Sequence, residues 1–476
     1  MLSRISARAL TAALGGWRTR EPAYEALADG IRLLCLDNRI APRTALPAER
    51  ELAAALGLSR STVAAAYGSL RASGHIESVR GSGSITMPLG RRDVGRVTPD
   101  TDSIDLQQAS PAAWPGLAGV IAAVASDAPS IVARSGYDVL GTPALRALIA
   151  DDYSARGIAT DPSQIMVTTG AQSAIHLIAG VLVGRGDPVV LETPTYPHAA
   201  DAFAAAGARL IGVPVTTQDG WDLDRATQVF SRSLPVLAYL MPRFQNPTGR
   251  TMRPEEQQTI LTAAERAGTF LVLDETTADL GIDQTSAEAS FAIAPASSRT
   301  VLRVGSLGKT VWGGLRIGWI RADPDVIRRL VAARPARELG TPELEQAIAA
   351  ALFAHMPAIR EQRAAVLREG RDALTAALSA HIPEWQVPST AGGVALWVGL
   401  GAPLSSSLVL RARNEGVLLS AGPRFSIDGG HERHLRLPFT APADQLVRAV
   451  EVLSRAWDRV RGETPAQFGE PLEAVV

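Results

Sequence analysis

Apolar runs of strand length alternate with longer helical segments over much of the chain. In order, the pairs are QIMVTTG and AQSAIHLIAGVLV, DPVVLETP and HAADAFAAAG, and VLAYLMP and PEEQQTILTAAERAG, followed by the apolar run FLVLDE. Parallel strands need long crossover connections, which helices usually supply. The alternation therefore predicts an α/β body, a mostly parallel sheet with helices on both faces. In such sheets, ligands bind beyond the carboxyl ends of the strands.

The length of the chain, 476 residues, exceeds what one hydrophobic core usually supports. At ~100–200 residues per domain we expect two to four domains, and one large domain with a smaller one would also fit. A hydrophobic content of 46% and a charged content of 20% exclude disordered and fibrous classes. The single cysteine, Cys35, excludes an internal disulfide framework and suits a reducing compartment.

The sequence does not favour a membrane protein. No apolar run approaches the ~20 residues that cross a bilayer. The start, MLSRISARALTAALGG, is similar to a signal peptide, but its apolar stretch is short and it lacks a clear cleavage site. We therefore expect a cytoplasmic protein with no membrane partner.

The first 90 residues differ in charge from the rest of the chain. They hold 11 arginines and 7 acidic residues, a net charge of +4, and the whole chain carries −1, so residues 91–476 carry −5. The segment also predicts three helices, PAYEALADGIRLLCLDNRI, LPAERELAAALG and LSRSTVAAAYGSLRASG. Gly57 is placed to end the second helix and Ser59 to cap the third. The expected buried face of the third helix carries Val63, Ala66, Tyr67 and Leu70.

Two helices joined by a short turn form a helix-turn-helix, whose second helix presents its first residues to the DNA major groove. Here that helix starts with Ser-Arg-Ser-Thr, which suits phosphate oxygens and base edges. After it, HIESVRGSGSITM predicts a hairpin with Arg80 at its tip. A small helical domain without a DNA function would show the same helix start, but the basic hairpin after three helices favours DNA.

Residues 22–87 resemble the winged helix of the GntR family, whose pattern "LP..RELA..LG.SR.TV..AY..L...G" followed by "GSG" stands here as LPAERELAAALGLSRSTVAAAYGSLRASGHIESVRGSG. The resemblance implies a double-stranded DNA operator as partner. The contacts that it implies come from Arg50, Ser59, Arg60, Ser61, Thr62, Arg80 and Gly83. Residues 88–103, PLGRRDVGRVTPDTDS, predict a linker because they are charged and rich in Gly and Pro. We therefore expect a DNA-binding domain over residues 1–87 and a body over residues 104–476.

Several predicted strands of the body end in residues that suit a charged, flat ligand. Gly170, Ala171 and Gln172 open a helix, where free N–H groups bind anions. Tyr196 can stack on a ring, and Asn246 in RFQNPTG can donate to a ligand oxygen. Each of these residues alone also has an ordinary explanation as a turn or a core side chain. Asp274 ends LVLDE, and a carboxylate at the end of a buried strand is seldom unpaired.

GSLGKT contains Lys309, the only lysine among 47 Lys and Arg residues. A guanidinium group is not deprotonated in proteins, whereas a lysine amine can lose its proton and form a Schiff base with an aldehyde. Ser306 and Arg316 lie close to it in the sequence and suit a phosphate. The whole set suits pyridoxal 5′-phosphate. Its members would be a phosphate cup (Gly170, Ala171, Gln172, Ser306, Arg316), a stacking ring (Tyr196), a ring-oxygen donor (Asn246), a pyridinium carboxylate (Asp274) and the amine of Lys309.

Over residues 104–462 this order of motifs resembles the class I aminotransferases of fold type I. The resemblance implies a smaller C-terminal α/β subdomain, a homodimer with shared sites, no metal, and an internal aldimine at Lys309. It also implies that Tyr137 of GYDVLGTPALR reaches the phosphate of the neighbouring subunit and that Arg436 of LRLPFT binds a substrate carboxylate. The family usually has a tyrosine two or three residues after the aspartate. Here Thr276 lies in that place, and Gly313 replaces the usual proline before Gly-Leu-Arg.

A GntR-like head before an aminotransferase-like body is the architecture of the MocR subgroup of bacterial transcription regulators. The resemblance implies a homodimer with heads exchanged head to tail, which senses pyridoxal phosphate, a small amino compound, or both. A genuine aminotransferase with an accessory head is the alternative, and the retained Lys309 and Arg436 favour it. The absent tyrosine and the DNA-binding head favour a regulator. A body without cofactor is a third interpretation, which conflicts with the complete phosphate cup. The effector, the operator and the direction of regulation are left open.

Overall fold

The computed structural model describes residues 3–14, 17, 22–36, 39–79, 83–87, 103–133, 135–283, 299–427 and 429–463. The helices of the head are α1 (Ala7–Leu14), α2 (Ala23–Leu36), α3 (Glu49–Leu56) and α4 (Arg60–Ala72). Its strands are β1 (Ser3–Arg4), β2 (Thr44–Ala45), β3 (Ile76–Val79) and β4 (Gly83–Thr86), in the sheet order β1-β2-β4-β3.

Local sequence signals of the head are confirmed. Gly57 ends α3 in the left-handed conformation with φ 65°. Ser59 caps α4 by accepting a hydrogen bond from the Thr62 N–H, and the predicted apolar face of α4 is buried. The antiparallel pair β3 and β4 forms the predicted hairpin. Helix α1 was not among the predicted helices. It buries Leu10 and Leu14 against the other three helices.

The body is built on an eight-stranded sheet with the order β6-β13-β12-β11-β10-β7-β8-β9. The strands are β6 (Ile165–Thr168), β7 (Pro188–Thr193), β8 (Arg209–Thr216), β9 (Gly220–Trp221), β10 (Leu237–Leu240), β11 (Phe270–Asp274), β12 (Val301–Ser306) and β13 (Gly318–Arg321). All neighbours from β12 to β8 pair in parallel. Strand β13 is antiparallel to β12 and β6, and β9 is antiparallel to β8. The predicted mostly parallel sheet is confirmed.

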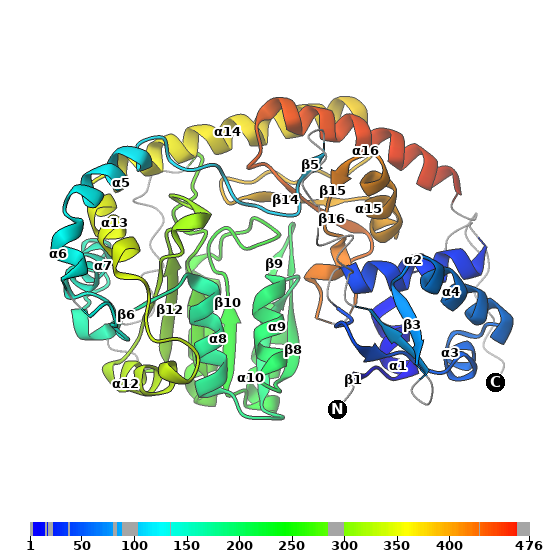
Figure 1. Cartoon of the computed structure of the whole chain (residues 1–476), viewed down its shortest axis with the longest axis horizontal. Coiled ribbons are helices and arrows are strands. Elements are labelled where there is room, and N and C mark those ends of the chain that lie inside the picture. Colours follow the sequence, from blue (N-terminus) through cyan, green and yellow to red (C-terminus); the bar gives the residue numbers. More distant parts are fainter. Residues whose placement is uncertain are drawn as a thin grey trace.

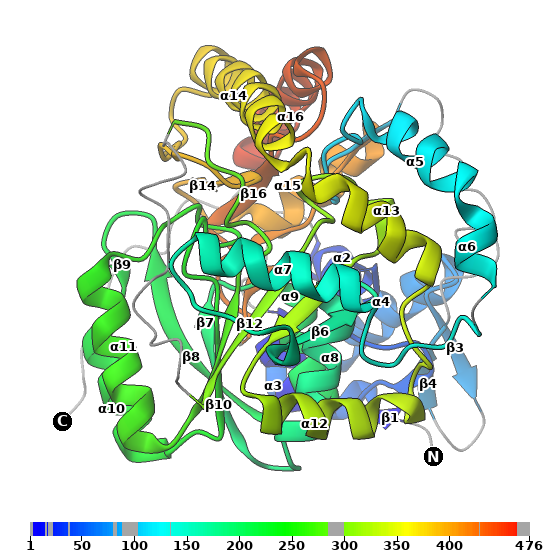
Figure 2. The ribbon, with the colours of Figure 1, turned by 90° about the vertical axis from the view of Figure 1, so that its left-hand side faces the viewer.

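Helices cover both faces of this sheet, as Figure 2 shows. On one face α8 (Ala171–Leu182), α9 (Pro197–Ala205) and α12 (Pro324–Ala333) pack on residues such as Val189 and Tyr239. On the other face α10 (Leu223–Ser233) and α11 (Pro254–Ala267) pack on Val190 and Ala238. Neighbouring strand residues thus point to opposite cores, as the two-residue period of a strand requires. The remaining helices near β6 are α5 (Leu117–Ser126), α6 (Ala128–Val132), α7 (Pro143–Ala155) and α13 (Glu343–Phe353).

The last part of the chain forms a separate core. Its elements are α14 (Met356–His381), β14 (Ala395–Gly399), α15 (Ser405–Asn414), β15 (Val417–Leu418), β16 (His434–Pro438) and α16 (Ala443–Glu463). Strands β14 and β16 are antiparallel, and β15 pairs in parallel with β5 (Ile104–Asp105), the first strand after the head. The head lies beside this subdomain in Figure 1, and Leu33 of α2 packs into the subdomain core.

The predicted linker lies almost wholly outside the described residues, because residues 88–102 are not among them. The division into domains at residues 87 and 103 stays a prediction. Within the described ranges, no helix combines the length and the apolar character needed to cross a membrane.

Candidate functional site

The predicted site residues follow the carboxyl ends of neighbouring strands. Gly170 follows β6, Tyr196 follows β7, Asn246 follows β10, Asp274 ends β11 and Ser306 ends β12. Strand β6 runs in the same direction as β12, because each is antiparallel to the β13 strand between them. The carboxyl ends of these strands therefore meet at one edge of the sheet, and the fold brings residues far apart in the sequence together.

Asp274 is a buried carboxylate of this edge, with 2% of its surface exposed. Its carboxylate accepts hydrogen bonds from the Tyr239 hydroxyl and from the Thr276 N–H, the latter at 2.9 Å. Burial raises the pKa of Asp274, and the two hydrogen bonds act in the opposite direction. Thr276, the residue in the place of the usual tyrosine, thus contacts Asp274 through its main chain.

Tyr239 was not predicted as a site residue. It lies in β10 within the run VLAYLMP and is fully buried. Burial raises the pKa of Tyr239 well above the usual value, and the negative charge of Asp274 raises it further. The sequence signal is a tyrosine in a run that is otherwise apolar, because a buried phenol needs a hydrogen-bond partner. That signal marks a partnered hydroxyl but does not reveal which residue is the partner.

Lys309 lies just after β12, and its Nζ donates to the Ala109 carbonyl at 2.7 Å. The pKa of Lys309 is lowered to about 8, by burial first and by the positive charge of Arg436 second, whereas the charge of Asp274 acts in the opposite direction. A lysine with a pKa near 8 has an appreciable fraction of free amine at neutral pH, and the free amine is the nucleophilic form.

The start of α8 is shaped for close approach of an anion. Gly170 caps this helix with φ 84°, and a Cβ there would lie 2.6 Å from Arg316 Nη2. The Arg316 guanidinium also donates to the Thr169 carbonyl at 3.1 Å. Glycine thus leaves room for a guanidinium beside free helix N–H groups, which together bind phosphates and carboxylates.

The other two predicted cup residues make hydrogen bonds to nearby main-chain groups. Ser306 Oγ donates to the Ile317 carbonyl and accepts from the Gly308 N–H, both at 3.0 Å. Gln172 Nε2 donates to the His198 carbonyl at 2.9 Å, and its Oε1 is buried without a partner among the described residues. Ala171 is the first residue of α8, so its N–H is one of the free helix-start groups.

Asn246 and Tyr196 follow the neighbouring strands β10 and β7. Asn246 is 4% exposed, and its Oδ1 is buried without a hydrogen-bond partner in the described part of the chain. Burial raises the pKa of Tyr196 to about 12, Asp274 adds to this, and Arg436, Arg316 and Arg424 act against it. The ring therefore lies among the charged groups of the site. The His198 ring packs edge-on against it, 5.4 Å between centroids.

Arg436 reaches the site from β16. It is 6% exposed, and its guanidinium lies 4.7 Å from the centroid of the Phe425 ring. Nη2 donates to the Gln107 carbonyl at 2.6 Å, whereas Nε is buried without a partner among the residues described. Burial lowers the pKa of Arg436 to about 10. Because no carboxylate of the described ranges forms an ion pair with it, Arg436 is suited to an incoming anion.

Tyr137 is not part of this cluster within one chain. It lies between α6 and α7 and is 72% exposed.

Four of the predicted DNA residues, Ser59, Arg60, Ser61 and Thr62, lie at the start of α4. Ser59 Oγ lies 2.8 Å from Ser61 Oγ and 2.7 Å from Thr62 Oγ1. The Arg60 side chain is 75% exposed, and its Nε lies 3.5 Å from Glu49 Oε2. Arg50 is exposed on α3, and Gly83 begins β4 with φ 81°. Arg80 lies outside the described residues.

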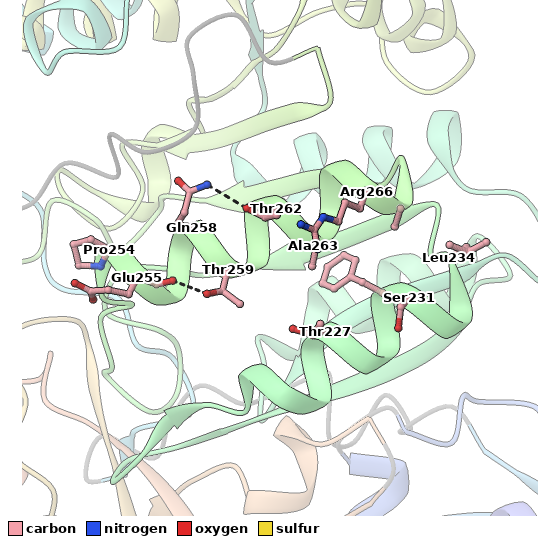
Figure 3. A pocket seen from close by; sticks show the side chains of 12 residues that line it. Thr227, Ser231, Leu234, Pro254, Glu255, Gln258, Thr259, Thr262, Ala263 and Arg266 are labelled. Carbon is pink, nitrogen blue, oxygen red and sulfur yellow. Dashed lines mark hydrogen bonds between the residues drawn. The ribbon is translucent and has the colours of Figure 1, made fainter.

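A hollow elsewhere on the molecule contains none of the predicted site residues. Its volume is about 940 Å³, and it lies between α10 and α11 on the outer face of the sheet, as Figure 3 shows. Phe230, Leu234 and Ala263 are among its lining residues. Its size alone does not make it the functional site, because the unpartnered atoms Asn246 Oδ1, Gln172 Oε1 and Arg436 Nε belong to residues that do not line it.

Two families match the chain. The family described as "Aminotransferase class I and II" matches residues 121–453, and the one described as "Bacterial regulatory proteins, gntR family" matches residues 23–85. The chain is 31% identical to the probable rhizopine catabolism regulatory protein MocR of Rhizobium meliloti, over 65% of this chain and 68% of that protein. It is 27% identical to the uncharacterized HTH-type transcriptional regulator YdfD of Bacillus subtilis, over 83% and 87%.

A solved structure is similar to the body. The α-aminoadipate aminotransferase LysN of Thermus thermophilus, complexed with N-(5′-phosphopyridoxyl)-L-leucine, superposes with a TM-score of 0.69 at 29% identity. The match covers 78% of this chain and 97% of LysN.

Proposed function

Because this chain belongs to the aminotransferase class I and II family and joins that domain to a GntR-type DNA-binding domain in the MocR-like manner, we propose that it is a pyridoxal phosphate-dependent transcription regulator. Its body senses pyridoxal phosphate, a small amino compound, or both, and its head binds a double-stranded DNA operator. We place the protein in the cytoplasm.

The observation that carries the cofactor proposal is the set of unsatisfied polar groups around Lys309. Asn246 Oδ1, Gln172 Oε1 and Arg436 Nε are buried without partners among the described residues. Buried polar atoms normally have partners, so these gaps indicate a ligand. The residues therefore fit pyridoxal phosphate, which supplies an aldehyde for an amine and an electron-poor ring.

Each residue has a defined task toward this group. Gly170, Ala171, Gln172, Ser306 and Arg316 would hold the phosphate, and Tyr196 would stack on the ring. Asn246 would contact the ring oxygen, and Asp274 would face the pyridinium nitrogen with its ionised carboxylate fixed by Tyr239 and Thr276. Lys309 would supply the amine, and Arg436 would bind the carboxylate of the effector.

The cofactor proposal is tested by visible absorption. Purified protein with pyridoxal phosphate is expected to absorb in the visible range, and Lys309→Arg is expected to lose this absorption because arginine keeps the charge but cannot form a Schiff base. The control is Lys309→Arg combined with Arg185→Lys, which restores one lysine on an exposed loop and is expected to stay colourless. A colourless wild-type protein that cannot be loaded would contradict the proposal.

A genuine aminotransferase is the second candidate. The lowered pKa of Lys309 and the position of Arg436, whose Nη2 contacts only a main-chain carbonyl, favour it, because catalysis needs a free amine and a carboxylate anchor. Steady turnover with an amino acid and a keto acid, at the ~1–10³ per second usual for enzymes, would establish it over the regulator-only function.

We further propose a homodimer in which Tyr137 completes the site of the neighbouring subunit. Tyr137 is 72% exposed in the single chain, which supports this proposal. A large aromatic side chain that is exposed in one subunit is suited to be covered by a second subunit. Within the chain, the head packs on its own C-terminal subdomain through Leu33. The exchange of heads between subunits stays a prediction.

A further inference from the structure

A short segment that follows the head contacts two residues of the site. After β5, residues 106–110 run toward α5, and Figure 1 shows this stretch passing along the C-terminal subdomain. We call residues 106–110 the strap. The last strand of the head, β4, ends at Thr86. The first described element of the body after it is β5, and the strap continues directly from β5.

The strap contacts Arg436 and Lys309, two of the three cationic residues of the predicted site, and Arg316 is the third. The Gln107 carbonyl accepts from Arg436 Nη2 at 2.6 Å, and the Ala109 carbonyl accepts from Lys309 Nζ at 2.7 Å. Two main-chain oxygens, two residues apart, therefore occupy both cationic groups. These are the groups that a ligand carboxylate and the cofactor would need.

The two contacts are weaker than those that a ligand would make. A carbonyl oxygen carries no net charge and takes one N–H of Arg436, whereas a carboxylate brings the opposite charge and can accept two parallel hydrogen bonds from a guanidinium. Arg436 Nε also lies buried without a partner among the described residues, so a carboxylate could use a donor that the strap leaves unused. The strap thus satisfies Arg436 only in part.

The strap is fastened by few hydrogen bonds beyond its first residue. The Leu106 N–H donates to the Leu418 carbonyl at 2.9 Å, and the Leu106 side chain is buried. Further along, the Gln107 N–H donates to Asp105 Oδ1 at 2.8 Å, and Gln107 Nε2 donates to the Leu419 carbonyl at 3.3 Å. Asp105 itself is exposed. The turn at Gln107 therefore depends on contacts that can be removed without opening the core.

We propose that the strap is an autoinhibitory contact, in which the Gln107 and Ala109 carbonyls hold Arg436 and Lys309 until a carboxylate-bearing ligand of the cofactor site displaces them. The inference rests on the function proposed above for this site. Ligand binding then has to release the strap, so a weaker strap gives tighter ligand binding. By thermodynamic reciprocity, a state of the head that keeps the strap in place weakens ligand binding.

The test uses the full-length chain and N-(5′-phosphopyridoxyl)-L-leucine, which carries phosphate, ring and carboxylate and needs no turnover. Titration calorimetry gives its dissociation constant. Asp105→Ala removes the acceptor of the Gln107 N–H, and Gln107→Ala removes the bond to Leu419. Both variants are expected to bind the probe several-fold more tightly than the wild type.

The matched control is Asp161→Ala. Asp161 Oδ1 accepts from the Ser163 N–H at 2.8 Å, the same local turn, and lies before β6 at the end of that strand away from the site. The affinity of Asp161→Ala for the leucine adduct is expected to equal that of the wild type. Pyridoxamine phosphate, which has no carboxylate to compete for Arg436, is expected to show a smaller gain in Asp105→Ala than the leucine adduct.

The possible results separate the two proposals. If both strap variants bind the leucine adduct with unchanged or weaker affinity while the wild type binds it well, the autoinhibitory strap is wrong and the cofactor site stands. Equal gains for the two probes would also overturn the competition at Arg436. If the wild type binds neither probe, the proposed function fails, and the strap inference fails with it.

Discussion

At the scale of single residues, the site combines three buried ionisable side chains. Lys309, Asp274 and Arg436 lie close enough for their ionisation to be linked, because burial removes the screening by water. All other Lys and Arg residues of the chain are arginines. Lys309 is therefore the only residue of this group that can lose its proton near neutral pH.

The ionisation of Lys309 predicts how loading depends on pH. Only the free amine reacts, so the rate of cofactor loading is expected to rise with pH through a midpoint at about 8, the pKa of Lys309, and to level off at higher pH. Arg436→Met removes a positive charge that lowers this pKa, so its midpoint is expected at higher pH. Absorption followed from about pH 6 to about pH 10 measures both midpoints, and an unshifted midpoint in Arg436→Met would contradict the coupling.

Tyr239 predicts a second change at this scale. Tyr239→Phe removes a hydrogen bond that stabilises the ionised Asp274, so the pKa of Asp274 rises and its pairing with the pyridinium weakens. A hydrogen bond to a charged group contributes about 1.5–3 kcal/mol, so cofactor affinity is expected to fall about tenfold or more. Tyr153→Phe is the control, because the Tyr153 hydroxyl donates to Glu275 instead, at 2.7 Å. Equal losses in both variants would assign the effect to packing.

At the scale of elements, local signals predicted the head well and the site only in part. Caps, apolar faces and the hairpin were visible because they depend on residues close in sequence. The insertion of antiparallel β13 between β12 and β6 was not predicted, because pairing between distant strands leaves no local pattern. The strap contacts could not be predicted either, since main-chain carbonyls are present at every residue and only the fold selects Gln107 and Ala109.

Helix α4 carries a prediction for DNA binding. Arg60→Ala is expected to weaken operator binding, since Arg60 is exposed at the helix start. The slope of log binding constant against log salt concentration is expected to fall by about one, the amount for one lost phosphate contact. Its weak contact to Glu49 costs little to lose. Arg71→Ala, in the last turn of the same helix, serves as control. Fluorescence anisotropy with labelled operator at several salt concentrations measures the effect, and equal affinity of both variants would remove Arg60 from the interface.

At the scale of the whole molecule, the proposed dimer predicts that two defective chains repair each other. In a mixed dimer of Tyr137→Ala and Lys309→Arg, one site combines an intact Lys309 with an intact Tyr137 from the other chain. The purified mixed dimer is therefore expected to bind cofactor at one of its two sites with wild-type affinity, although Tyr137→Ala alone binds weakly and Lys309→Arg shows no absorption. Affinity that stays at the Tyr137→Ala level in purified mixed dimers would show that Tyr137 acts within its own chain or not at all.

The single lysine gives this protein one side-chain amine that can be modified and cleaved selectively. A protease that cuts only after lysine would divide the unfolded chain at one bond, between Lys309 and Thr310. If borohydride first fixes the cofactor to that amine, the bond becomes resistant, and the chain stays whole on a gel. The fraction of uncut chain then counts occupied sites directly, without colour, a known effector or an operator.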